Sequence, residues 1–230
     1  MDFQTLIDLD KQLLLAVNGS HSLYLDMLVR TLTHAATWIP LYLSLFYIVV
    51  KNNDRVQKIL LVLASAGLCV LIAGTIDDTI VKPFVARWRP THDPQIGLLV
   101  DIVDGYRGGR FGFFSAHASN TFSIAVFFWW LIRSRLLTTA MVTWSLTNCW
   151  TRLYLGVHYP GDIFVGLCWG AFTGSFVYWL YRRVCRRFAM EQHFTASHLT
   201  KTGYLRSDAD IPISVLVFTL LYALLKSTFV

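Results

Sequence analysis

The sequence contains little charge. Of its 230 residues, 14 are Asp or Glu and 20 are Lys or Arg, so charged residues make up 15% of the chain, whereas soluble globular domains carry about 25%. Hydrophobic residues make up 55%, and the mean hydropathy is +0.50. This balance excludes an ordinary soluble domain and predicts an all-α bundle of membrane-spanning helices, forming one domain over residues 1–230.

Three further features are missing. The N-terminal segment has neither the basic start nor the small-residue cleavage site of a signal peptide, so we expect the first span to direct insertion. The net charge of +6 is spread over short loops without a continuous basic face, so we expect no nucleic-acid partner. No cysteine pair has the spacing of metal ligands, which indicates four free thiols in or beside apolar runs: Cys69, Cys149, Cys168 and Cys185.

Long apolar stretches set the expected topology, because a helix needs about 20 apolar residues to cross the hydrocarbon core. Residues 3–17 place apolar side chains near helical spacing with charges between them, which favours an amphipathic interfacial helix over a further span, ended by Asn18-Gly19. Six stretches reach or approach the spanning length, the fourth being short and fairly polar: residues 23–50, 56–80, 115–132, 136–152, 160–181 and 211–229.

Basic residues between the spans suggest an orientation. The loops at 51–58, 133–135 and 182–187 fall on one side by parity, and their Lys and Arg residues predict that this side is cytoplasmic. The opposite side carries a comparable number of cations: Lys82, Arg87, Arg89, Arg107, Arg110 and Arg152. We interpret those that belong to the motifs described next as functional charge and discount them. The motifs should then face away from the cytoplasm.

The first motif, KPFVARWRP, follows the second span. Its Lys82 and Arg89 are separated by six residues, and Pro83 and Pro90 limit helix continuation. Both cations can bind one phosphoryl group, Arg through a bidentate fork and Lys as a point charge. Taken alone, the same residues also fit basic side chains that extend toward lipid headgroups.

The second motif, SAHAS, stands where the third span should begin. Backbone N–H groups at a helix N-terminus favour anions, and the Ser115 hydroxyl can add a donor. His117 can protonate a leaving oxygen. The alternative is a Ser N-cap followed by an interfacial His.

The third motif, TRLYLGVHYPGD, joins the fourth and fifth spans. His158 and Asp162 are four residues apart, and Pro160 is well placed to open the fifth span. Asp162 can accept a hydrogen bond from one ring nitrogen of His158 and leave the other free to attack. Arg152 would add a phosphate donor. Alternatively, Asp162 only stabilises the positive helix N-terminus and His158 is an ordinary interfacial side chain.

All three motifs lie where a span meets the same side of the membrane, so they can converge in one pocket. In this order and spacing they resemble the phosphatidic acid phosphatase type 2 superfamily, membrane lipid phosphatases related to vanadium haloperoxidases. The family pattern is Lys, six residues, Arg-Pro; then Pro-Ser-Gly-His; then Ser-Arg, five residues, His, three residues, Asp. Over roughly residues 56–180 it is matched by Lys82 with Arg89-Pro90, by Phe114-Ser115-Ala116-His117, and by Thr151-Arg152 with His158 and Asp162.

The resemblance implies a role for each matched residue. His158 would be the nucleophile that forms a phosphohistidine, Asp162 would orient it, and His117 would protonate the leaving group. The family needs no metal or other cofactor, and the sequence has no carboxylate cluster suited to one. The groups implied to bind the phosphoryl oxygens are Lys82, Arg89, Ser115, the Ala116 amide and Arg152.

Three positions depart from the family pattern. Phe114 replaces Pro, Ala116 replaces Gly and Thr151 replaces Ser. None of these changes removes a reactive group, so we still expect activity. We also expect a negative φ at Ala116, because a positive φ strains a residue that has a Cβ.

The sequence therefore predicts an integral-membrane, metal-independent phosphatase for a phosphorylated membrane lipid. Resemblance to small bacterial members implies the inner membrane with a periplasmic site. Lipid A and undecaprenyl pyrophosphate are the favoured substrates, ahead of phosphatidylglycerophosphate and phosphatidic acid, and no residue separates a monophosphate from a pyrophosphate. The same residues also fit a lipid phosphotransferase or a non-catalytic phospholipid-binding or transport protein. The sequence leaves the oligomeric state open.

Overall fold

The computed structural model describes residues 2–20, 22–188, 190 and 196–229. Within these residues the chain is all-helical, and its β structure is limited to two isolated bridges, Trp88 with Phe111 and Leu199 with Leu205. The α-helices are α1 (Phe3–Val17), α2 (Leu23–Thr33), α3 (Ile39–Lys51), α4 (Val56–Ile76), α5 (Lys82–Val85), α6 (Ala116–Ile132), α7 (Arg135–Tyr154), α8 (Pro160–Arg187) and α9 (Asp210–Lys226). Four short helical turns complete the set: η1 (Ala35–Trp38), the π turn η2 (Asp77–Val81), η3 (Pro90–His92) and η4 (Val103–Gly105).

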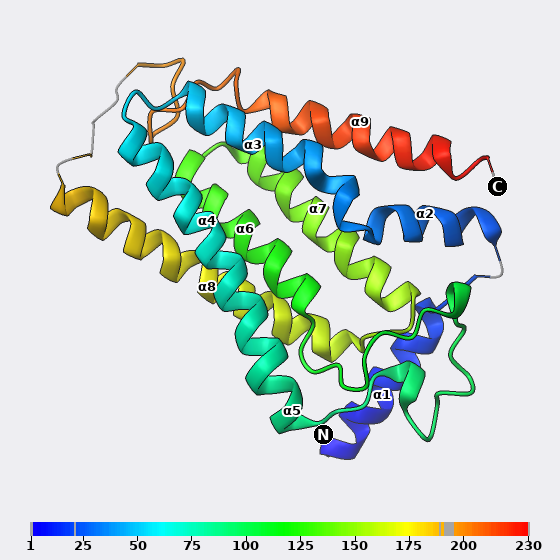
Figure 1. Cartoon of the computed structure of the whole chain (residues 1–230). Coiled ribbons are helices and arrows are strands. Elements are labelled where there is room, and N and C mark those ends of the chain that lie inside the picture. Colours follow the sequence, from blue (N-terminus) through cyan, green and yellow to red (C-terminus); the bar gives the residue numbers. More distant parts are fainter. Residues whose placement is uncertain (1, 21, 189, 191–195, 230) are drawn as a thin grey trace.

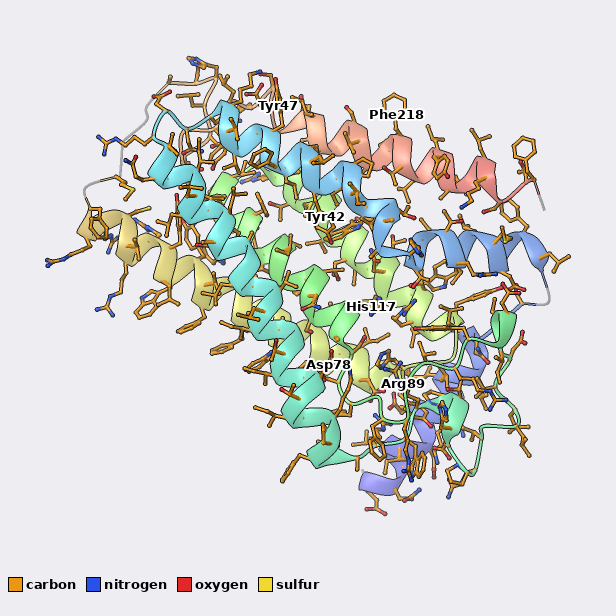
Figure 2. All side chains as sticks on the ribbon, in the orientation of Figure 1. Tyr42, Tyr47, Asp78, Arg89, His117 and Phe218 are labelled. Atoms are coloured by element: carbon orange, nitrogen blue, oxygen red, sulfur yellow. The ribbon has the colours of Figure 1, made fainter. Side chains whose placement is uncertain are left out.

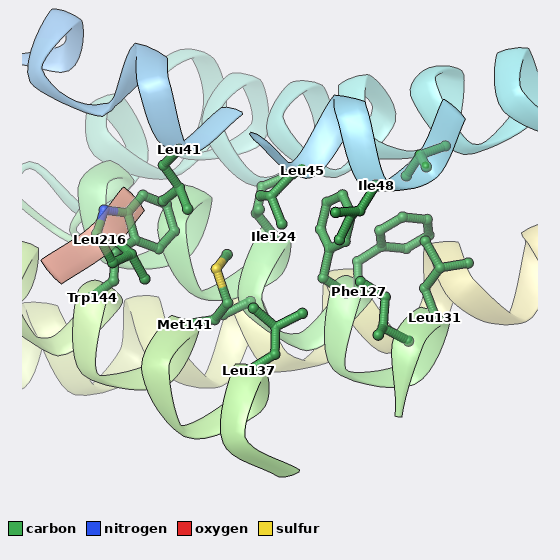
Figure 3. Packing of buried hydrophobic residues seen from close by; sticks show 14 of the residues in the cluster. Leu41, Leu45, Ile48, Ile124, Phe127, Leu131, Leu137, Met141, Trp144 and Leu216 are labelled. Carbon is green, nitrogen blue, oxygen red and sulfur yellow. The ribbon is translucent and has the colours of Figure 1, made fainter. Parts of the chain in front are cut away.

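The long helices lie side by side, and α6 packs against α4, α7 and α8 (Figure 1). Helix α1 packs on the ends of α7 and α8, beside the long loop that follows α5. One hydrophobic core is formed between α3, α6, α7 and α9 (Figure 3), with members that include Leu41, Leu45, Ile48, Ile124, Phe127, Leu131, Leu137, Met141, Trp144 and Leu216. The members of this core in α6 begin at Ile124, so the polar residues of α6 at its N-terminal end lie outside the core.

Helices α6 and α8 approach each other unusually closely. A Cβ added to Gly166 would lie 2.7 Å from the carbonyl oxygen of Ser115, and one added to Gly170 would lie 2.7 Å from that of Ser119. Small residues at four-residue spacing let two helix backbones meet in this way. As a result, α8 sits directly on the backbone of the segment that opens α6.

The predicted span 23–50 is not one straight helix. Helices α2 and η1–α3 meet at an angle of 66°. Pro40 lies in the first turn of α3 and has no N–H for a continuous helix, while the His34 side chain caps η1 by accepting from the amide of Ala36. In the described part of the chain, two helical segments are long and apolar enough to cross a membrane, or three if this bent pair counts as one.

The second predicted span, 56–80, continues further than expected. Pro83 was expected to limit the helix, but helical backbone runs on through Val85 and ends where Ala86 adopts a left-handed φ of 48°. The wider π turn Asp77–Val81 stands directly before Pro83, whose ring does not fit regular α-helical bonding. The long loop therefore begins at Ala86 rather than at Lys82.

The remaining predicted elements agree more closely with the structure. Helix α1 ends at Val17, followed by Asn18 and by Gly19 at a φ of 65°, as the Asn-Gly pair predicted. Helix α8 begins at Pro160. Residues 189 and 191–195, between α8 and α9, lie outside the described residues.

Candidate active site

The three motifs meet at one end of the bundle, opposite the turns at 52–55 and 133–134 (Figure 1). Figure 2 shows Asp78, Arg89 and His117 toward this end. Two backbone amides at the start of the second motif bond to neighbouring segments. The amide of Ser115 donates to the carbonyl of Asp162 (3.1 Å), and the amide of Phe114 donates to Oδ1 of Asp77 (3.1 Å), in the turn just before Lys82.

Lys82 is held by two carboxylates. Its Nζ lies 2.8 Å from Oδ2 of Asp77, which is fully buried, and 2.5 Å from Oδ1 of Asp78, which faces solvent. Both aspartates therefore pair with Lys82. The two contacts hold the ammonium group at the end of the long helix, 12% exposed.

Arg89 is fixed by backbone carbonyls of two other segments. Its Nε donates to Phe111 (3.1 Å) and its Nη1 to Val157 (3.5 Å). Gly108, at a φ of 66°, passes so close that an added Cβ would lie 2.6 Å from Nη1 of Arg89. The glycine-rich part of the loop therefore closes over the guanidinium, as only glycine allows here.

Arg152 is a buried guanidinium with unused donors. It is 2% exposed, and neither its Nε nor its Nη2 has a hydrogen-bond partner. The ring of Tyr106, from the long loop, lies 5.9 Å from its Cζ. Buried donors without partners are costly, and an anion beside Arg152 would satisfy them.

His158 lies in the turn between α7 and α8 and is 2% exposed. Burial lowers its pKa well below the usual range, and the nearby charges of Arg89 and Lys82 act in the same direction, so the imidazole is neutral at physiological pH. Its Nδ1 lies 3.6 Å from Oδ2 of Asp162, slightly longer than a hydrogen bond. The predicted pair is thus adjacent.

Ser115, Ala116 and His117 form the first turn of α6. The hydroxyl of Ser115 caps the helix by accepting from the amide of Ala118 (3.5 Å), so the capping alternative describes its local role. Ala116 is the first helical residue, and its φ is negative as predicted. His117 is exposed, and Arg152 and His158 are close enough to act on it electrostatically.

One residue at the site was missed by sequence reasoning. Nη1 of Arg87 lies 2.6 Å from Oδ1 of Asp162, and Nη2 lies 2.6 Å from Oδ2 of Asp10 in α1. The sequence placed Arg87 only among the cations of this side. Its position inside the first motif, two residues before Arg89, was the available signal, but nothing in the sequence indicated Asp10 as its partner.

Together these groups suit phosphoryl transfer. A neutral imidazole, a second exposed imidazole and three basic side chains from separate segments surround one another, which is the positioning and charge stabilisation that such transfer requires. In the described ranges, no three His, Cys, Asp or Glu side chains gather as a metal-binding group, and metal independence stays a prediction.

Comparison with known proteins agrees with this geometry. Residues 55–186 match the model of the PAP2 superfamily, a region that contains all three motifs. The chain belongs to the PAP2 superfamily. This PAP2 protein is 41% identical over 208 residues to a lipid A 4'-phosphatase of Bacteroides thetaiotaomicron, a match that covers 90% of the chain and 84% of that protein.

Two further relatives extend the comparison. A lipid A 4'-phosphatase of Porphyromonas gingivalis is 32% identical to this PAP2 chain over 182 residues, which cover 76% of the chain and 74% of that protein. A decaprenylphosphoryl-5-phosphoribose phosphatase of Mycobacterium tuberculosis is 33% identical over 112 residues, or 49% of the chain and 57% of that protein. No solved structure matches the chain significantly.

Proposed function

We propose that this protein is an integral-membrane phosphatase that hydrolyses a phosphate ester of lipid A through a phosphohistidine on His158. Its relatives over most of the chain are lipid A 4'-phosphatases, which favours lipid A over undecaprenyl pyrophosphate. The relative that acts on a polyprenyl-linked sugar phosphate covers a smaller part of the chain. A polyprenyl-linked phosphate is therefore the second candidate substrate.

The observation that carries the proposal is the buried Arg152, with two unpaired donors beside a buried neutral imidazole. A phosphoryl group bound there would accept from Arg152 and Arg89 and approach His158. Lys82 would add charge from the start of α5, the Ser115 hydroxyl would add a donor, and the backbone N–H group of Ala116 lies at the positive N-terminus of α6.

The chemistry then follows in two balanced steps. In the first, the Nε2 lone pair of His158 forms a bond to phosphorus while the ester P–O bond breaks, and the leaving oxygen takes a proton from His117, whose protonated form is favoured by the negative charge of the bound phosphate. In the second, water attacks phosphorus, the P–N bond breaks, and neutral His117 takes the proton from water. Inorganic phosphate leaves, and both histidines return to their starting states.

The apolar helices support a location in the membrane. The face that is covered by lipid in this proposal includes many exposed apolar side chains on α3, α4, α8 and α9, among them Leu43, Leu71, Phe164 and Phe218. Six spans, a bacterial inner membrane and a periplasmic site remain part of the proposal. An interfacial site would admit a lipid headgroup sideways from the leaflet.

Phosphate release by the purified protein in detergent with EDTA tests this function. The substrates are lipid A, a polyprenyl diphosphate and phosphatidic acid, and His158→Ala is compared with wild type. His198→Ala is the matched control, because His198 is exposed and belongs to the segment 196–209, which lies at the opposite end of the molecule (Figure 1). We expect EDTA-resistant release from lipid A that is lost in His158→Ala and kept in His198→Ala.

Other outcomes distinguish the alternatives. Release that survives in His158→Ala, or that requires added metal, contradicts the phosphohistidine mechanism. Transfer of label from the substrate phosphate to an acceptor lipid, in place of free phosphate, identifies a phosphotransferase. Binding of lipid without turnover by the wild type identifies a non-catalytic protein.

A further inference from the structure

The carboxylate of Asp162 has two separate sets of partners. Its Oδ2 faces Nδ1 of His158 at 3.6 Å and accepts from the amide of Tyr159 at 3.0 Å. Its Oδ1 receives Nη1 of Arg87 at 2.6 Å. Asp162 is fully buried, so no solvent replaces a lost partner. The rotation of this carboxylate about its own axis is therefore set by Arg87 on one oxygen and by the backbone on the other.

Arg87 is itself held by a helix that lies outside all three motifs. Its Nη2 bonds to Oδ2 of Asp10 at 2.6 Å, and its guanidinium lies over the ring of Tyr159 at 4.2 Å. Asp10 uses its other oxygen to accept from the amide of Gly161 at 2.7 Å. A Cβ on Gly161 would lie 2.9 Å from Oδ2 of Asp10, so the two segments are in close contact.

Helix α1 is attached to the site along its length as well as through Asp10. At its end, Asn18 donates to the carbonyls of Tyr154 (2.8 Å) and Asp101 (3.0 Å) and accepts from the amide of Asp101 (2.7 Å). In its middle, Lys11 lies 3.7 Å from Asp93. The position of Asp10 is thus defined from both sides.

We propose that Arg87 and Asp10 are positioning residues for the reaction, through which α1 holds the carboxylate of Asp162 and so the ring of His158. The inference rests on the proposed function of that site. Both terminal nitrogens of Arg87 are engaged by carboxylates of the protein, whereas Arg152 has unpaired donors for a phosphate. Arg87 therefore acts on the catalytic histidine through Asp162, not on the substrate.

This role predicts a specific kinetic pattern. Losing Arg87 should lower kcat by roughly 100-fold, as a small misplacement of a reacting group does, with little change in KM, because no phosphate contact is lost. Arg87→Lys should fall between wild type and Arg87→Gln, since an ammonium group keeps the charge but not the fork that spans two carboxylates. Asp10→Asn should show the same pattern with a smaller loss.

The experiment measures kcat and KM for lipid A phosphate release by wild type, Arg87→Gln, Arg87→Lys and Asp10→Asn. Asp8→Asn is the matched control, because Asp8 lies on the same helix, is exposed and accepts only from Gln4. Each variant is first checked for a single elution peak and for its apparent Tm in detergent, so that misfolded protein is excluded.

A second measurement separates positioning from general damage. In the Asp162→Asn background, measured with enzyme in excess over substrate, Arg87→Gln and Asp10→Asn should cause no further loss, because the group they position is already gone. Further loss in that background overturns the proposal. So does a raised KM with unchanged kcat in Arg87→Gln, which would place Arg87 on the phosphate, or full kcat in Asp10→Asn.

These results are distinguishable from failure of the function itself. If wild type releases no phosphate, or His158→Ala remains active, the proposed function fails. If wild type and His158→Ala behave as expected while Asp10→Asn equals Asp8→Asn, only the positioning inference fails.

Discussion

At the scale of single residues, Arg152 shows how a binding site differs from a stable core. Its guanidinium is buried, yet its Nε and Nη2 bond to nothing within the described protein. These two donors do not stabilise the folded protein, because buried donors without partners cost free energy. The arrangement becomes favourable when an anion arrives.

Replacing Arg152 should therefore separate stability from activity. We expect Arg152→Met to keep or raise the apparent Tm while abolishing phosphate release, because the substitution removes an unsatisfied buried charge. Inorganic phosphate should raise the Tm of wild type and of the exposed-loop control Arg107→Met, but not that of Arg152→Met. Thermal unfolding in detergent, with and without phosphate, measures both effects. A phosphate-dependent rise in Arg152→Met would contradict the assignment.

The buried His158 should make stability depend on pH in a defined direction. Because burial lowers its pKa in the folded protein, the unfolded chain takes up a proton near pH 6.5 that the native chain does not. Stability should thus fall as the pH drops below about 6.5, by up to about 1.4 kcal/mol for each unit of pKa difference. In His158→Gln this contribution is absent.

The measurement is the apparent Tm between pH 7.5 and 5 for wild type, His158→Gln and the exposed control His198→Gln. Wild type and His198→Gln should lose stability together toward low pH, and His158→Gln should lose less. Equal slopes in all three proteins would show that the pKa of His158 is not lowered in the folded state.

At the scale of elements, the contact between α6 and α8 positions the second and third motifs. The missing side chains of Gly166 and Gly170 allow the backbone carbonyls of Ser115 and Ser119 to come within 2.7 Å of where a Cβ would stand. Because backbone atoms cannot rotate away as a side chain can, an added methyl group must push the helices apart. That movement would carry Ser115 away from the Asp162 carbonyl to which its amide donates.

This predicts opposite results for two glycines in helices. Gly170→Ala should lower both the apparent Tm and phosphate release, by an overpacking cost of about 1–3 kcal/mol. Gly67→Ala, in α4, should be neutral or slightly stabilising, because nothing lies within 4 Å of the added Cβ and alanine favours helix. Thermal unfolding and activity of the two variants, side by side, check the prediction. Equal loss in both would show that helix propensity, and not the contact, is responsible.

At the scale of the whole molecule, the two ends of the bundle differ in what they carry. One end holds the candidate site, the long loop and α1, and the other holds the turns at 52–55 and 133–134 and the segment 196–209 that leads into α9 (Figure 1). The basic residues of that second end predict that it is cytoplasmic. The site end would then face the periplasm.

Labelling of single cysteines tests this orientation. In a Cys168→Ser background, which removes the exposed native thiol, Arg107→Cys reports on the site end and Lys201→Cys on the opposite end. In intact spheroplasts, a membrane-impermeant maleimide should label Arg107→Cys, whereas Lys201→Cys should react only after lysis. The reverse pattern would place the site on the cytoplasmic side.

Sequence reasoning reached most of the candidate site because the groups it named occur in motifs with fixed spacing. Lys82, Arg89, Arg152, His158 and Asp162 all lie where their segments meet. It failed on details that depend on backbone geometry, such as the 66° bend before α3 and the π turn that lets the helix pass Pro83. The local sequence did not indicate that a π turn before Pro83 would let the helix continue past this residue.

The amino-acid sequence by itself determined the helical class, the apolar character of the helices, the order of the motifs and the residues of the candidate site, because these follow from composition, apolar length and spacing along the chain. Only the tertiary structure decided which groups pair. The contact of Arg87 with both Asp10 and Asp162 joins residues 77 and 75 positions away from it, and the unpaired state of Arg152 depends on every segment that packs around it. Such pairings have no local signal, because they arise when helices from distant parts of the chain pack against one another.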